Sequence, residues 1–137
     1  MQRHFLYLPF ALQIFGVMAI SMIVPSLYAL VTEQFFEARM FFYTGLLGVT
    51  FLALIGLARS NQTSRETALD QMLSLALIFV FLPVFLAIPE YSVIRTTSFL
   101  NAYLDMVSAL TTTGFEVFPA SRLSDSLHLW RALVGWM

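Results

Sequence analysis

Three long apolar runs constrain the fold of this chain more than any other feature. They cover residues 7–31, 40–58 and 70–90, and none contains a charged residue between its end positions. A helix needs about 20 apolar residues to cross the hydrocarbon core of a bilayer, so each run is long enough to span it. Only 11% of the 137 residues are charged, whereas a soluble domain usually carries about 25%. The sequence therefore predicts an all-α polytopic membrane protein.

Residues that are rare or missing exclude several classes of protein. The chain contains no cysteine, which excludes disulfides, a thiol nucleophile and a thiolate metal site. Its net charge of −1 gives no attraction to nucleic acid. No hydrolase, metalloprotease or nucleotide-binding motif occurs, and His4 and His128 belong to no carboxylate–histidine cluster with metal-ligand spacing. We therefore expect neither an enzyme nor a bound cofactor.

The first two apolar runs are interpreted as spanning helices joined by a polar loop at residues 32–39. The first run exceeds the roughly 7–15 residues of a signal-peptide core, and no small-residue cleavage site closes it. Pro25 removes a backbone donor inside this run and predicts a kink. The second run carries small residues on which another helix can pack closely, namely Gly45, Gly48 and Gly56.

A polar stretch at residues 59–70 leads into the third span. Thr63 followed by Glu66 fits a capping box for that helix. Pro83 predicts a bend within the span, and Pro89 with Glu90 predicts its end.

The distribution of arginine predicts the orientation in the membrane. Arg3, Arg59 and Arg65 lie on one side of the predicted spans, and acidic residues gather on the other side. The positive-inside rule then favours a cytoplasmic N-terminus and a cytoplasmic loop at 59–70. The segment after the third span therefore faces the outside.

A short amphipathic run follows from Ser98 to Leu110. At 1.5 Å per residue it is too short to cross a bilayer, and it contains the polar residues Asn101 and Asp105. Such a segment fits a re-entrant half-helix, which membranes accept only where protein or water surrounds it. The C-terminal end of the half-helix carries partial negative charge and favours a cation beyond Leu110.

Three threonines and a glycine follow this half-helix directly. Thr111, Thr112 and Thr113 are stiff at χ1, and Gly114 permits a positive φ. These residues suit an extended backbone that turns its carbonyls toward an ion, as in the filters of potassium channels. The bland alternative is a polar turn between two helices, where threonine and glycine are common. The flanking segments favour the filter, with potassium bound by the carbonyls of the three threonines.

The stretch resembles the first pore loop of the Trk/Ktr/HKT potassium-uptake family, specifically the TrkH type. In that family a short helix carries an acidic residue, then Ser-Gly-Leu, then Thr-Thr-Thr-Gly. Here Asp105 matches the acidic position, Ser108 the serine, and residues 111–114 the filter. Residues 129–137, which read LWRALVGWM, resemble the start of the family's next helix.

The chain also departs from the family pattern. Ala109 stands where glycine is usual, Asn101 where aspartate is frequent, and Asp105 where glutamate is more frequent. None of these changes removes the filter chemistry. Over residues 1–97 the resemblance rests on the number and order of the apolar segments.

The resemblance implies a domain organisation and a function. Residues 1–60 would be two leading transmembrane helices, and residues 61–137 the first of four helix–pore loop–helix repeats, truncated in its second helix. The chain is thus expected to be a fragment or a truncated reading frame. The family takes up potassium across the bacterial inner membrane, and residues 111–114 would form one quarter of its selectivity filter. Glycine at position 114 implies potassium over sodium. A homodimer and a cytosolic nucleotide-binding regulatory subunit are also implied.

Two residues are expected to support the filter, Asp105 and Ser108. Asp105 is an ionisable group at membrane depth, which favours a functional role. The alternative, which we prefer, is a hydrogen bond that holds the half-helix to the following loop, because a buried carboxylate needs partners. Arg131 is expected either to reach the membrane surface or to pair with Asp105 or Glu116.

A different class of function also fits these features. Three spans with a polar half-helix would suit a small non-catalytic membrane protein that helps to assemble another complex. An intramembrane enzyme is a weaker alternative, because no catalytic constellation occurs.

Overall fold

The computed structural model describes residues 10–59 and 67–136 of the chain. The described part is helical throughout and contains no strand, as predicted. Its elements are α1 (Phe10–Ser21), α2 (Ile23–Val31), α3 (Phe35–Arg59), α4 (Ala68–Ile94), α5 (Phe99–Leu110), the 3₁₀ turn η2 (Ala120–Arg122) and α6 (Asp125–Trp136).

Three helical segments are long and apolar enough to span a membrane, which confirms the predicted class. They are Phe10–Val31, Phe35–Arg59 and Ala68–Ile94. The second span begins five residues before the predicted start, because the connecting turn occupies residues 32–34 alone. In that turn Glu33 adopts a φ of +61°, and the Thr32 hydroxyl donates to the Tyr28 carbonyl at 3.1 Å.

The first span is interrupted at Met22, between α1 and α2. Pro25 lies three residues further on and cannot donate to the preceding turn. The predicted kink is therefore confirmed. Helix α2 is tied to α3 by the buried Ser26 hydroxyl, which donates to the Ala38 carbonyl at 2.9 Å.

Helix α4 runs through both of its prolines to Ile94, so the predicted end at Pro89 and Glu90 is wrong. Side chains from neighbouring helices donate to carbonyls near each proline. The Tyr103 hydroxyl donates to the Val80 carbonyl at 3.0 Å, and the Trp130 indole donates to the Leu86 carbonyl at 3.3 Å. A membrane helix tolerates proline where neighbours satisfy its backbone in this way.

The start of α4 is capped by Thr67 and Asp70, which form a capping box. The Thr67 amide donates to the Asp70 carboxylate at 2.9 Å. The predicted box at Thr63 and Glu66 lies outside the described residues.

Close helix packing at two of the three predicted glycines joins α1 to α3. A Cβ added at Gly45 would lie 3.0 Å from the Ala19 carbonyl oxygen, and one at Gly48 would lie 2.9 Å from the Ala19 Cβ. At Gly56 a Cβ would meet nothing within 4 Å. The packing expectation therefore holds for Gly45 and Gly48, and Gly56 takes no part in it.

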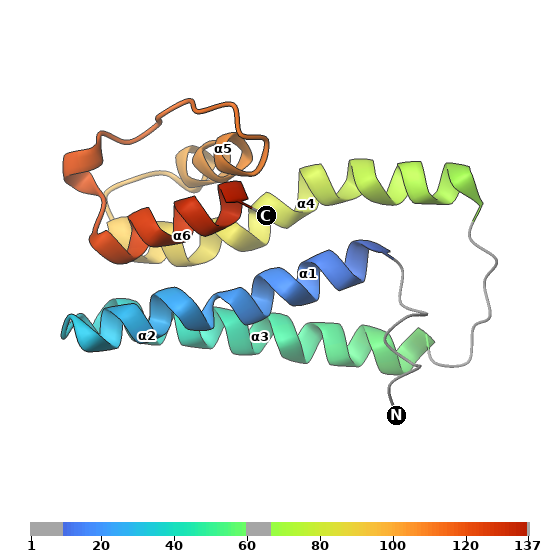
Figure 1. The fold of residues 1–137 in the computed structure, drawn as a ribbon, viewed down its shortest axis with the longest axis horizontal. Coiled ribbons are helices and arrows are strands. Elements are labelled where there is room, and N and C mark those ends of the chain that lie inside the picture. Colours follow the sequence, from blue (N-terminus) through green and yellow to red (C-terminus); the bar gives the residue numbers. More distant parts are fainter. Residues whose placement is uncertain (1–9, 60–66, 137) are drawn as a thin grey trace.

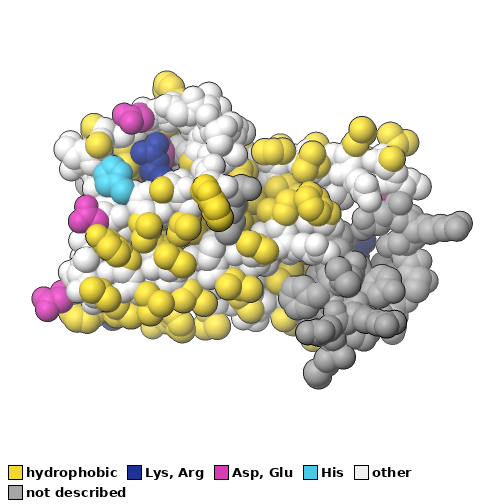
Figure 2. Space-filling model, viewed as in Figure 1, with side chains coloured by type: hydrophobic (Ala, Val, Ile, Leu, Met, Phe, Trp, Pro, Cys, Tyr) yellow, Lys and Arg dark blue, Asp and Glu magenta, His cyan; other side chains and the backbone are white. Residues whose placement is uncertain are grey.

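The short helices gather at one end of the long ones. Figure 1 shows α5 nearly end-on, so it crosses the direction of α3 and α4. Helix α5 packs mainly on α4, and α6 packs on α2 and α5. Their shared core includes Trp130, Phe41, Met106 and Leu86. The turn at 32–34, the end of α4 and the start of α6 all lie at this same end (Figure 1). Charged side chains also collect there, whereas hydrophobic side chains cover much of the long helices (Figure 2).

Candidate functional site

A short helix is present where the sequence predicted one at 98–110: it is α5, with Ser98 as its N-cap. The Ser98 side chain accepts from the Asn101 amide at 3.4 Å. One face of the helix is buried and contains Ala102, Asp105, Met106 and Ser108. The twelve residues of α5 therefore place two polar side chains in the interior, at the helix end that leads into the threonines.

The threonine stretch closes α5 with a tight turn. The Thr113 amide donates to the Ser108 carbonyl at 3.0 Å, and the Thr112 amide donates to the Ala109 carbonyl at 3.2 Å. This pair of bonds is the Schellman motif, in which the residue at Thr112 takes the left-handed conformation, here with φ +53°. Glycine usually occupies that position, and a β-branched residue there is strained. The expected extended backbone is therefore wrong for Thr111 and Thr112.

The residues of the turn are exposed, and some of its polar groups have no hydrogen-bond partner among the described residues. The Thr111 hydroxyl donates to the Val107 carbonyl at 2.7 Å and lies 2.7 Å from the Thr113 hydroxyl. Across residues 10–59 and 67–136, no hydrogen bond uses the carbonyls of Thr111, Thr112 or Thr113. Gly114 follows with φ +73°, the left-handed conformation that its sequence position predicts, and faces open space.

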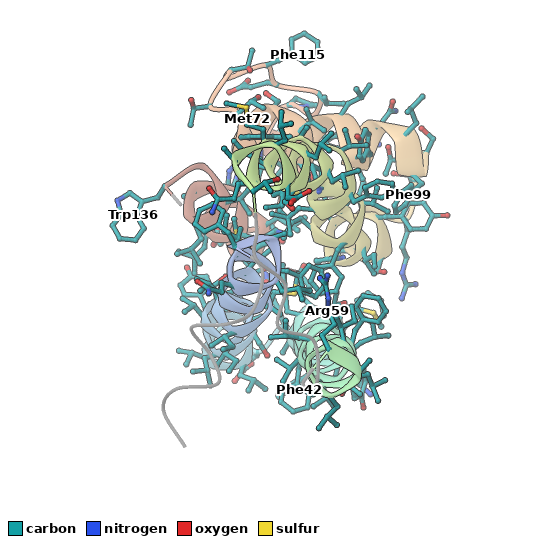
Figure 3. All side chains as sticks on the ribbon, turned by 90° about the vertical axis from the view of Figure 1, so that its right-hand side faces the viewer. Phe42, Arg59, Met72, Phe99, Phe115 and Trp136 are labelled. Atoms are coloured by element: carbon teal, nitrogen blue, oxygen red, sulfur yellow. The ribbon has the colours of Figure 1, made fainter. Side chains whose placement is uncertain are left out.

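Two hydrogen bonds hold the loop after Gly114 against α5. The Ser108 hydroxyl donates to the Phe115 carbonyl at 2.9 Å, and the Val117 amide donates to Asp105 Oδ1 at 3.3 Å. The predicted hydrogen bond from Asp105 to the loop is thus present. The Phe115 side chain points away from the helices (Figure 3), whereas Phe118 is buried and fixes the far end of the loop.

Asp105 also pairs with Arg131 of α6, one of the two partners expected for this arginine. The Arg131 Nε atom lies 2.8 Å from Asp105 Oδ2. The N–H does not point at the oxygen, so the contact is an ion pair without a hydrogen bond. Asp105 is fully buried. One carboxylate therefore links α5, the loop at Val117 and α6.

A third ionisable residue, Glu90, lies at this junction and was missed by sequence reasoning. The sequence predicted that the third span ends at Pro89 and Glu90, but Glu90 is fully buried within α4, which continues to Ile94. Its carboxyl interacts with Asp105 and Arg131. Neither of its oxygens has a hydrogen-bond partner among the described residues. The apolar residues that follow it, Tyr91 to Ile94, are the signal that the helix continues past Glu90.

Sequence reasoning also missed a polar contact between α3 and the start of α6. Glu37, which was expected in a loop, lies in the first turn of α3. Its carboxylate accepts from the Ser124 hydroxyl at 2.7 Å and from the buried Ser126 hydroxyl. Because the carboxylate lies beside the N-terminus of α6, its negative charge also interacts favourably with the positive end of that helix dipole.

No conventional metal site appears in the described part of the chain. Within residues 10–59 and 67–136, no three His, Cys, Asp or Glu side chains are grouped so that they could hold a metal ion. The His128 ring lies 3.1 Å from the Ala120 carbonyl oxygen, and His4 falls outside the described residues. The candidate site is therefore the threonine turn with its anchored loop.

Comparisons with known proteins do not place the chain in a family. No family model, no curated protein and no solved structure matches it.

Proposed function

We propose that the chain contributes a potassium filter loop to a membrane transport protein of the TrkH type. The observation that carries this proposal is the threonine turn at the end of the short helix α5, with three carbonyls that accept no hydrogen bond from residues 10–59 or 67–136. Carbonyl oxygens that are not engaged elsewhere can replace the water around a potassium ion. The four residues Thr111, Thr112, Thr113 and Gly114 would supply one quarter of the filter.

The surroundings of the turn support this role physically. The C-terminal end of α5 presents partial negative charge toward the turn, which favours a cation there. The hydrogen bonds from the Ser108 hydroxyl to Phe115 and from the Val117 amide to Asp105 anchor the loop that follows the turn to buried side chains of α5. A filter needs such anchoring, because ion selectivity depends on the placement and field of its carbonyl dipoles.

Other parts of the proposal rest on the resemblance in sequence. A complete pore needs further loops around a common axis, and this chain carries one. Potassium would enter from outside, lose water at the threonines and pass inward across a bacterial inner membrane, with the N-terminus in the cytoplasm. A homodimer and a cytosolic nucleotide-binding regulatory subunit belong to the same proposal.

Rubidium and sodium uptake tests the proposal. The full gene product would be expressed in bacteria that lack their own potassium uptake, and Gly114→Ser would be compared with the unchanged protein. Because position 114 faces open space, a serine side chain fits but adds a hydroxyl and a strained φ next to the carbonyls. We expect uptake of rubidium with little sodium, and a reduced rubidium preference in Gly114→Ser.

The matched control is Gly56→Ser, because a side chain at position 56 also meets open space and lies at the far end of α3. It should keep the original ion preference. An absence of rubidium uptake by the unchanged protein, or the same preference in Gly114→Ser, would contradict the filter assignment.

A further inference from the structure

The junction of α4, α5 and α6 contains three ionisable side chains in a buried space. Glu90 and Asp105 are fully buried, and the Arg131 side chain is 19% exposed. Two carboxylates and one guanidinium leave one negative charge in excess. An uncompensated charge in a low-dielectric interior is costly, and proteins avoid it by pairing or neutralising the group.

The positive charge that the described residues place at this junction, on Arg131, is already paired with Asp105. Arg131 Nε is paired with Asp105 Oδ2 at 2.8 Å, and Asp105 Oδ1 accepts from the Val117 amide. Glu90 has no hydrogen bond to either of its oxygens within the described residues. The buried Glu90 carboxylate therefore lacks a positive charge to compensate it.

The other helices of the described part of the chain place no such charge beside Glu90. Helices α1 and α2 contain no charged residue, and α3 carries its charges at its two ends. Among the described residues, the charged neighbours of the Glu90 carboxyl are Asp105 of α5 and Arg131 of α6, which are paired with each other.

We propose that Glu90 and Asp105, beside Arg131, form a binding site for one proton, which neutralises the junction and steadies the loop that Asp105 holds. A proton fits better than a metal ion, because the neighbouring guanidinium repels a metal and two carboxyls offer too few ligands. The shared proton lets one carboxyl donate to the other and leaves the Asp105–Arg131 pair in place. The inference goes beyond the transport proposal and does not rest on it.

Infrared spectroscopy of the full chain in lipid nanodiscs tests the site. A buried protonated carboxyl has a carbonyl band that is distinct from that of a carboxylate. We expect this band in the unchanged protein at neutral pH. It should disappear in Glu90→Gln and equally in Asp105→Asn, because either change leaves one carboxylate for one guanidinium. Glu33→Gln is the control, since Glu33 is exposed in the turn after α2, and the band should persist in it.

The consequence for the loop can be measured with a single cysteine, since the chain has none of its own. Phe115→Cys places a thiol on the exposed loop, and Ser121→Cys serves as a reference for the effect of pH on thiol reactivity. The labelling rate at position 115 divided by that at position 121 should rise severalfold when the pH is raised enough to remove the proton from the site. In combination with Glu90→Gln the ratio should not change with pH.

Three results would overturn the proposal. The first is the absence of a protonated-carboxyl band in the unchanged protein. The second is a band that persists in both Glu90→Gln and Asp105→Asn. The third is the binding of one sodium or rubidium ion per chain that is lost in Glu90→Gln, which would assign the site to a metal cation. A labelling ratio that is independent of pH in the unchanged loop would refute the link between the proton and the loop.

Discussion

The left-handed conformation of Thr112 gives a prediction whose sign is opposite to ordinary expectation. Replacing a loop residue by glycine usually destabilises a protein by about 0.4–1 kcal/mol, because glycine gains freedom in the unfolded chain. At Thr112, however, φ is +53° and the side chain is β-branched. The left-handed conformation costs an L-residue about 1–2 kcal/mol, and glycine avoids that cost. Thr112→Gly should therefore raise the free energy of unfolding by about 0.5–1 kcal/mol.

Thr113→Gly is the matched control for this prediction. Thr113 lies one residue further along the same exposed turn and does not have a positive φ. It also contacts the Thr111 hydroxyl at 2.7 Å, which glycine would remove. We expect Thr113→Gly to lower the free energy of unfolding by about 0.5–1 kcal/mol.

Reversible denaturation in mixed micelles, followed by circular dichroism, measures both changes. Opposite signs for the two variants would support the strained turn. If Thr112→Gly were as destabilising as Thr113→Gly, the assignment of a strained Schellman turn at the end of α5 would be refuted. Strained residues persist where the surrounding structure holds them, and they cluster at functional sites, which agrees with the role that we propose for this turn.

Two further predictions concern contacts between helices. Gly48→Ala should lower the free energy of unfolding by about 1–3 kcal/mol through overpacking, since the new Cβ would lie 2.9 Å from the Ala19 Cβ. Gly56→Ala, in open space within α3, should instead raise the free energy of unfolding by up to about 1 kcal/mol, because alanine is the better helix former, and equal losses in both variants would contradict the packing account. Glu37→Ala should cost about 1–3 kcal/mol, because two serine hydroxyls at the start of α6 lose a carboxylate acceptor. The same denaturation assay checks this, and an unchanged stability would mean that Glu37 does not anchor α6.

Local sequence was sufficient to predict the three long apolar helices and the short helix α5. Span positions follow from apolar length, which the bilayer constrains directly. Helix α5 was predicted to within one residue, because Ser98 is a good N-cap and the stiff threonines end the helical pattern. The positive φ of Gly114 was likewise predictable, since glycine has no Cβ to oppose it.

Tertiary contacts decided the features that local sequence missed. Pro89 and Glu90 resemble a helix end, yet α4 continues because α5 and α6 cover this part of it. Glu90 is fully buried beside Asp105 of α5 and Arg131 of α6, and the local sequence around Glu90 does not indicate these neighbours. The backbone at Thr112 was predicted to be extended, because threonine rarely adopts a positive φ. In the structure, two backbone hydrogen bonds to α5 override that preference. Glu37 was assigned to a loop. Its serine partners lie almost ninety residues later in the chain, so local sequence does not indicate the contact.

The proposed filter requires that the carbonyls of Thr111, Thr112 and Thr113 bind a monovalent cation. A structure of the full gene product in its assembled form, obtained with rubidium in place of potassium, tests this claim most directly. The account predicts rubidium density beside these carbonyls, on an axis shared with other pore loops. Density elsewhere, or a threonine turn that faces lipid with no ion beside it, would contradict the account.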